Sequence, residues 1–139
     1  MRSSLPANNY VENDAVVVVG GANSAGQAAL ALAEDRRKVH LVVRGDSLER
    51  SMARYLRDRI ADNGLDVLFA HEVHLLAGTT HLEQVIVQNI GTGEQRTIDA
   101  GALLVLIGAA PRTDWLAGAI ALDEEGYVLT GPVVARRPE

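Results

Sequence analysis

The chain has 139 residues, of which 47% are hydrophobic and only 4% aromatic, and its formal net charge is −5 at neutral pH. A chain of this length forms one domain with a real core, which Val, Leu, Ile and Ala must fill. The acidic balance argues against a binder of nucleic acid or anionic membrane, because those surfaces are also negative. Because the chain has no cysteine, these residues hold no disulfide, thiolate metal site or thiol nucleophile.

Residues 1–14 are polar and lack the apolar core of a secretion signal, so we expect them to form a lead-in tail. No apolar run in the chain approaches the ~20 residues that span a bilayer. We therefore expect a cytoplasmic protein that enters no membrane.

Apolar runs typical of strands buried on both faces occupy residues 15–19, 39–43 and 65–70. Between the first two, Asn23 and Ser24 are good N-cap residues, and the Ala-rich stretch that follows predicts a helix to Glu34. The connection over residues 35–38 is a charged turn.

A second helix is expected between the second and third strands. Its apolar residues recur at helical spacing and are Leu48, Met52, Leu56 and Ile60. Asp46 or Ser47 is expected to cap its start, and Gly64 stands where a helix C-terminal glycine belongs. The order strand-helix-strand-helix-strand predicts a parallel sheet with helical crossovers.

The pattern changes after residue 70. Residues 72–77, 82–90 and 95–98 are strand-like and are separated by glycine-containing turns, which predicts a three-stranded antiparallel meander with one solvated face. Residues 103–107 form another apolar strand that ends at Gly108, and a short strand is possible at 127–129.

The strongest motif is VVVVGGANSAG over residues 16–26, a strand, a glycine turn and a helix start. Dinucleotide-binding domains use this arrangement to aim helix N–H groups at the pyrophosphate. The template G-x-G-x-x-A falls on Gly20, Ala22 and Ala25, so Ala22 replaces the glycine whose backbone approaches the phosphates. The alternative is a turn that needs glycine and binds nothing. A triphosphatase-type phosphate loop is excluded because Gln27 stands where lysine is required.

A second signal follows residues 39–43. An Asp or Glu at this strand end accepts the ribose 2′-hydroxyl of NAD, whereas a nearby Arg accommodates the 2′-phosphate of NADP. This chain has Val43 and then Arg44, which favours NADPH. Arg50 offers a second positive charge, although a solvated helix arginine is the simpler interpretation there.

Histidines invite a metal hypothesis. His71 and His74 lack the spacing of helical zinc ligands, and on a strand they would point to opposite faces. We expect no metal site.

With these signals in place, the sequence resembles the thioredoxin reductase-like flavoproteins. The resemblance is carried by VVVVGGANSAGQAA, VHLVVRGDSLERSM and LLVLIGAAPRTDWL, and it covers residues 15–116. It implies an α/β fold of three layers, a Rossmann-like parallel sheet with helices on one face and the meander on the other. Departures from the family pattern are Ala22, Gly45 in place of a second arginine, and Arg112 after Pro111.

The resemblance also implies the cofactor site. Asn23, Ser24 and Ala25 would lie against the pyrophosphate and ribose, Arg44 would hold the 2′-phosphate, and Ile107 with Gly108 would lie near the nicotinamide. The expected cofactor-binding residues are therefore Gly20, Gly21, Ala22, Asn23, Ser24, Ala25, Arg44, Arg50, Ile107 and Gly108. No residue is assigned a catalytic role.

These expectations define an NAD(P)-binding domain over residues 15–116 and a C-terminal segment over 117–139 that would begin a flavin domain. The family's flavin fingerprint, its flavin-closing Gly-Asp motif and its Cys-x-x-Cys dithiol do not occur in these residues. The chain would bind NADPH and supply hydride to FAD held elsewhere, with a flavin domain or a second copy as partner. Two alternatives stay open: a stand-alone nucleotide-binding or regulatory module without catalysis, and an inert domain whose site Ala22 blocks.

Overall fold

The structure is a computed structural model that describes residues 15–35, 37–116 and 118–132, and the expected lead-in tail lies outside them. The chain divides into two compact units between Ile107 and Gly108. The domain boundary expected after residue 116 therefore lies within the second unit, and the two units are described separately below. In the described part of the chain, no helix is long and apolar enough to cross a membrane.

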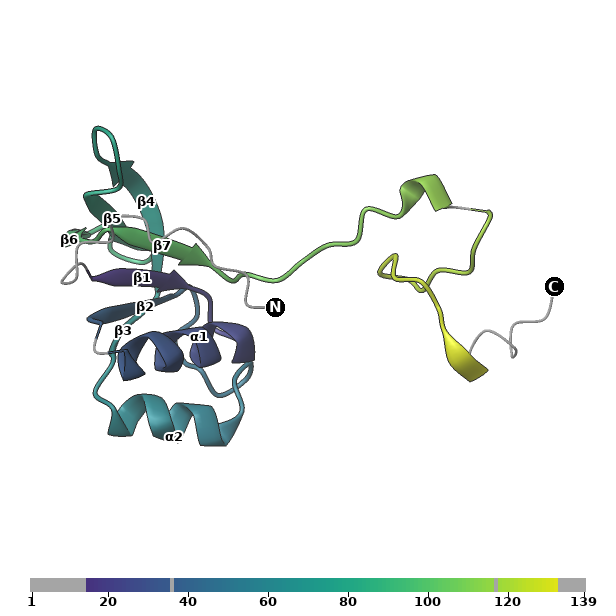
Figure 1. The fold of residues 1–139 in the computed structure, drawn as a ribbon, viewed down its shortest axis with the longest axis horizontal. Helices are drawn as coiled ribbons and strands as arrows, with labels where there is room; N and C mark the ends of the chain where they lie inside the picture. The colour runs from purple at the N-terminus through teal and green to yellow at the C-terminus, as the bar shows by residue number, and fades with distance from the viewer. Residues whose placement is uncertain (1–14, 36, 117, 133–139) are drawn as a thin grey trace, which may run out of the picture. The chain divides into compact units, whose positions relative to one another are not determined.

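The first unit is built on a four-stranded parallel sheet in the order β3-β2-β1-β7 (Figure 1). Its strands are β1 (Val16–Val19), β2 (Val39–Val43), β3 (Asp66–Phe69) and β7 (Ala102–Val105). Every residue of β1 and β2 is buried. Such strands carry uninterrupted apolar sequence because both of their faces are covered.

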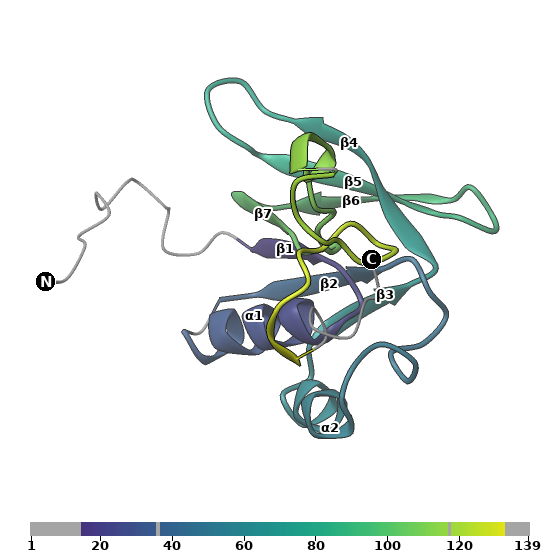
Figure 2. The ribbon, with the colours of Figure 1, turned by 90° about the vertical axis from the view of Figure 1, so that its right-hand side faces the viewer.

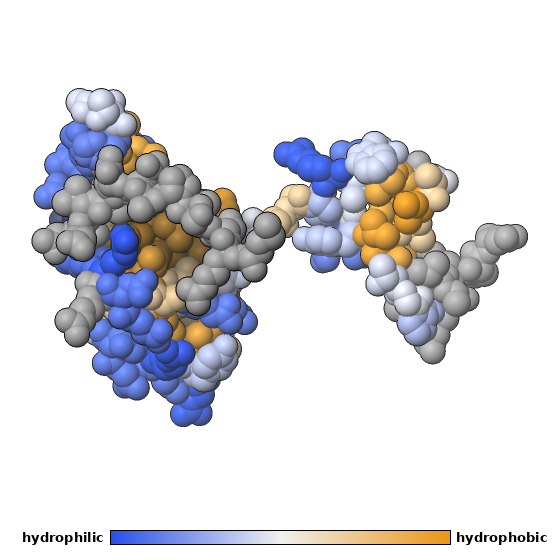
Figure 3. Space-filling model, in the orientation of Figure 1, coloured by the Kyte–Doolittle hydropathy of each residue, from blue (hydrophilic) through white to orange (hydrophobic). Residues whose placement is uncertain are grey.

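Two helices cover one face of this sheet, α1 (Asn23–Glu34) and α2 (Arg54–Asp62). Alternate residues of β1 and β2, such as Val16 and Leu41, pack on this side together with Leu56 and Ile60 of α2. The outer faces of the helices are hydrophilic, and hydrophobic residues gather between them and the other layers (Figure 3).

The opposite face is covered by an antiparallel meander in the order β4-β5-β6 (Figures 1 and 2). Its strands are β4 (His71–Ala77), β5 (Gln84–Asn89) and β6 (Gln95–Asp99). Val85, Val87 and Ile98 of the meander pack against Val17 and Val42 of the parallel sheet. The three-layer α/β fold expected from the resemblance is confirmed.

Local details of the helices differ from expectation. The N-cap of α1 is Ala22, with no side-chain hydrogen bond, so the expectation of Asn23 or Ser24 was wrong. The second helix begins only at Arg54, because the chain from Leu48 to Met52 forms a separate turn in which both N–H groups of Ser51 and Met52 bond to the Leu48 carbonyl. Leu48 and Met52 are nevertheless buried. Their spacing therefore indicated buried positions correctly, although these residues do not belong to the helix.

Gly64 ends α2 with φ +62°, as the sequence indicated. Its N–H bonds to the Ala61 carbonyl, and that of Leu65 reaches back to Ile60. This left-handed residue satisfies carbonyls at the helix end.

The second unit contains a short 3-10 helix, Asp114–Leu116, and little regular structure. The strand expected over 127–129 is reduced to an isolated antiparallel bridge between Leu122 and Val128. Asp123 organises the intervening turn, since its carboxylate accepts the N–H groups of Glu125 and Tyr127.

Candidate dinucleotide site

A cavity of about 350 Å³ lies at the carboxyl ends of β1 and β2. Its lining residues are Val19, Gly20, Gly21, Val42, Val43, Arg44, Gly45, Ser47, Ser51 and Ile107. In parallel α/β sheets, ligands bind in the crevice beyond these strand ends. The sequence indicated the glycine turn, Gly20 and Gly21, and the residue after β2, Arg44, by separate motifs. In the structure these residues line the same cavity.

Gly20 occupies a position that no other residue fits. Its φ is +145°, and a Cβ there would lie 2.4 Å from the Leu106 carbonyl oxygen and 3.0 Å from the Cβ of Ala25. Ala25 itself is completely buried. The turn thus depends on a bare backbone at Gly20 and a small side chain at Ala25, as expected for close packing of helix, turn and strand.

Two hydrogen bonds tie the glycine turn to the segment that precedes α2. The Ser51 hydroxyl donates to the Gly21 carbonyl at 2.6 Å. The Ala53 N–H donates to the Asn23 side-chain oxygen at 2.8 Å. The Oδ1 of Asn23, whose side chain was expected to lie against the pyrophosphate, is therefore already engaged, and its backbone N–H and side-chain Nδ2 remain as donors for a ligand.

The start of α1 offers an anion site. The N–H of Gly26 makes a helical bond to Ala22 at 3.1 Å, so the N–H groups of Asn23, Ser24 and Ala25 precede the first helical hydrogen bond. The first turn carries no acidic side chain that would compensate these donors. Unpaired N–H groups and the helix dipole together favour a negative ligand here.

Ala22 adopts φ −101° and ψ −179°. This is extended backbone that alanine reaches without strain. Its side chain is exposed, so the methyl group costs the fold nothing. If alanine in place of the family's glycine has a cost, that cost is weaker ligand binding and not lower stability of the fold.

Arg44 and Arg50 have different surroundings. Arg44 is exposed and lines the cavity directly after β2. Arg50 is also exposed but is not among the lining residues. Among the residues that the structure describes, no carboxylate lines this cavity. The positive charge of the site therefore comes from Arg44 and the helix terminus.

Of the two residues expected near the nicotinamide, Ile107 and Gly108, the cavity includes only Ile107. Ile107 lines the cavity and is 71% exposed, which leaves a large apolar surface for a ligand to cover. Gly108 begins the second unit, with φ +99°. Among the described residues, no cluster of His, Asp and Glu side chains could hold a metal ion.

Comparison with known proteins identifies the family of the chain. A family model described as pyridine nucleotide-disulphide oxidoreductase matches residues 3–133. The chain belongs to this family. Thioredoxin reductase of Rickettsia conorii is 33% identical over 125 residues, covering 87% of this chain and 40% of the relative. Thioredoxin reductase of Yarrowia lipolytica is 34% identical over 125 residues, covering 88% of this chain and 39% of the relative.

Solved structures in this family share the fold. Thioredoxin reductase of Streptococcus pyogenes superposes with a TM-score of 0.73 at 27% identity, covering 86% of this chain and 39% of that structure. The thioredoxin reductase of T. acidophilum gives a TM-score of 0.75 at 21% identity, with the same coverage. The chain thus spans about two fifths of the length of these thioredoxin reductases.

Ser51 is the main site residue that sequence reasoning missed in this family member. It lies in the turn before α2 and lines the cavity, while the neighbouring Met52 packs in the core with α1. A Cβ on Gly26 would lie 2.8 Å from the end of the Met52 side chain, so the glycine lets Met52 approach α1 without shifting. Gly26 is the fourth residue of α1, and a glycine in an Ala-rich helix gives no sequence signal for that contact.

Proposed function

We propose that this chain is the NADPH-binding domain of a thioredoxin reductase-like flavoprotein and that it presents NADPH to a flavin bound elsewhere. The observation that carries the proposal is Arg44, an exposed guanidinium that lines the cavity beside the glycine turn, where no carboxylate of the described residues competes. NADPH carries a 2′-phosphate that NADH and FAD both lack, and a nearby arginine is what accommodates that group.

The arrangement of charge supports the same assignment. The pyrophosphate would be held by the N–H groups at the start of α1, and the 2′-phosphate by Arg44 at the end of β2. Among the relatives, a protein named NADPH-dependent thioredoxin reductase 3, from Arabidopsis thaliana, is 34% identical over 126 residues.

In this proposal the chain's own residues bind and orient. Gly20 and Gly21 let backbone approach the phosphates, and the exposed side chain of Ile107 provides an apolar surface for the nicotinamide end. The chemistry that NADPH supplies is a hydride for a flavin acceptor, and binding by these residues fixes the direction in which it is offered.

Calorimetric titration of the purified chain with NADPH, NADH and FAD tests this assignment, with the visible absorption spectrum read on the same sample. We expect NADPH to bind at least tenfold more tightly than NADH, from one charge-assisted phosphate contact. We expect FAD to bind more weakly still and the spectrum to show no flavin. Preferential binding of FAD, or a stoichiometric flavin spectrum, would contradict the assignment to NADPH.

A further inference from the structure

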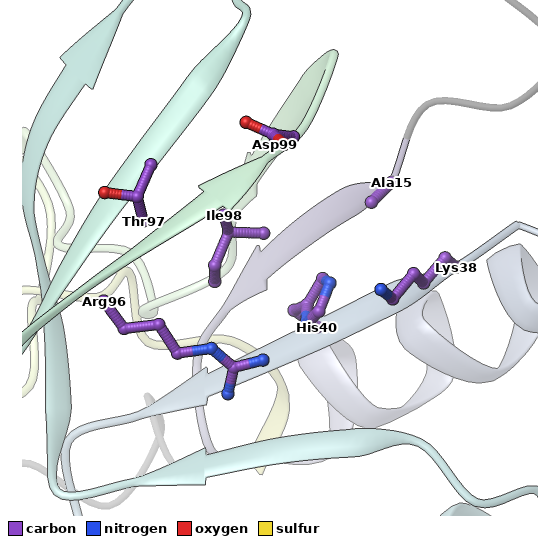
Figure 4. A pocket seen from close by; sticks show the side chains of 7 residues that line it. All are labelled: Ala15, Lys38, His40, Arg96, Thr97, Ile98 and Asp99. Carbon is purple, nitrogen blue, oxygen red and sulfur yellow. The ribbon is translucent and has the colours of Figure 1, made fainter.

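A second cavity, of about 360 Å³, lies at the amino ends of β1 and β2, whereas the dinucleotide site lies at their carboxyl ends. It is formed where β1 and β2 begin and where β6 of the meander crosses them (Figure 4). Its lining residues are Ala15, Lys38, His40, Arg96, Thr97, Ile98 and Asp99. We call this cavity the basic pocket, because the basic side chains Lys38 and His40 at the start of β2 meet Arg96 of β6 in it.

His40 forms the floor of the basic pocket and is only 3% exposed. Its Nδ1 lies 2.7 Å from a carboxylate oxygen of Asp66, which fixes the ring. Its Nε2 has no partner among the described residues. The only buried, unpaired side-chain nitrogen or oxygen in that part of the chain belongs to Arg57, so His40 Nε2 is open to the pocket.

Arg96 and Lys38 bring positive charge to the two sides of His40. Figure 4 shows the nitrogen atoms of both side chains directed toward the histidine ring. Arg96 uses one nitrogen, Nη2, to donate to Asp66 at 2.9 Å, which leaves its other N–H groups for a ligand. Lys38 is the only lysine of the chain and has no ion-pair partner among the described residues.

Two carboxylates accompany these groups, and both are already engaged. Asp66 accepts from His40 and Arg96. Burial would raise the pKa of Asp66, but the hydrogen bonds and positive charge of these two partners lower it below its usual value. The Asp99 carboxylate accepts a hydrogen bond from Gln84 at 2.9 Å and points away from the histidine ring in Figure 4. The groups that converge inside are therefore two cations and an open imidazole nitrogen.

We propose that the basic pocket binds a small oxyanion, a phosphate group that is either free or carried by a phosphate monoester. Arg96 and Lys38 supply charge-assisted donors of the kind that phosphate requires. His40 suits hydrogen phosphate in either protonation state, since neutral Nε2 accepts from its hydroxyl and the imidazolium donates to its oxygens.

The size of the basic pocket and its place in the fold define the ligand further. Its volume lies at the lower end of the range for small-molecule sites, which leaves room for a compact organic group beside the phosphate. Ala15 and Ile98 provide the apolar part of the wall. The inference does not depend on the dinucleotide assignment, because the two cavities share no lining residue.

Titration of the ¹⁵N-labelled 139-residue chain with inorganic phosphate, followed by amide chemical shifts, tests the proposal. Sodium chloride at matched ionic strength serves as the control for salt. We expect saturable shifts centred on residues 38–40 and 96–98. We expect Lys38→Gln to raise the dissociation constant about tenfold. Arg54→Gln, which removes the same charge from an 87% exposed side chain on α2, should leave it unchanged within twofold.

A second measurement needs no variant. Because Lys38 is the only lysine, its acetylation can be followed by mass spectrometry of one peptide. We expect phosphate, but not chloride, to slow that acetylation at least threefold. The proposal is overturned by shifts confined to residues 20–24 and 44, which would place phosphate only in the dinucleotide cavity. Equal weakening by Lys38→Gln and Arg54→Gln, or unprotected acetylation of Lys38, would overturn it as well.

Discussion

Replacing Ser51 with alanine separates the organisation of the glycine turn from direct contact with the cofactor. The substitution removes one hydrogen bond, from the Ser51 hydroxyl to the Gly21 carbonyl at 2.6 Å. Such a bond contributes about 1 kcal/mol. If that energy holds the turn in its binding conformation, its loss weakens dinucleotide binding about fivefold.

The choice of ligands makes this prediction sharp. NADPH and NADH share the pyrophosphate that the turn would hold, so Ser51→Ala should weaken both by the same factor. The matched control is Ser47→Ala, at a residue that lines the same cavity but makes no hydrogen bond to the turn in the structure. Calorimetric titration of the three proteins measures the factors. A loss confined to NADPH would mean that Ser51 contacts the 2′-phosphate, and unchanged affinity for both would show that the turn keeps its conformation unaided.

Three further outcomes follow from single positions. Gly20→Ala should lower the free energy of unfolding by about 3 kcal/mol or more in urea titrations, because φ is +145° and the new Cβ would meet the Leu106 carbonyl; a loss below 1 kcal/mol would show that the turn relaxes freely. The Asp66 carboxylate has a lowered pKa, so the stability it adds is present above its usual pKa of 3.8 and is lost as pH falls through the lower folded value. Since that carboxylate is 38% exposed, the advantage over Asp66→Asn should be about 1 kcal/mol or less at pH 6 and should vanish in acid; a constant difference across that range would contradict the assignment. Ala22→Gly should tighten NADPH binding from a dissociation constant of roughly tens of micromolar, without raising the melting temperature, because glycine adds unfolded-chain entropy; equal affinities would show that the methyl group is harmless.

Much of the fold could be predicted because the buried strands of this sequence are recognisable as runs of apolar residues. β2 was predicted to the residue and β1 to within one, since strands covered on both faces carry uninterrupted apolar runs. The meander was recognised from its glycine turns and from the partial alternation of residues 83–87. The start of α2 was misplaced because Leu48 and Met52 continue the helical spacing through a turn.

What could not be predicted depends on residues that are distant in sequence. Nothing near Ser51 indicates that its hydroxyl meets Gly21, and nothing near Asn23 indicates that its side chain accepts the N–H of Ala53. The basic pocket is a further case, because Arg96 approaches Lys38 and His40 only after the meander folds over the parallel sheet. Sequence patterns report which face of an element is buried, whereas these contacts depend on how layers are placed.

The assignment of NADPH to this chain rests on Arg44, and one comparison tests it most directly. The affinities of the wild-type chain and of Arg44→Gln are measured by calorimetry for NADPH and for NADH at the same ionic strength. We expect the substitution to weaken NADPH about tenfold or more and to leave NADH within twofold, because only NADPH carries the phosphate that the guanidinium would hold. Equal weakening of both cofactors, or a preference for NADPH that survives the substitution, would contradict the proposed site.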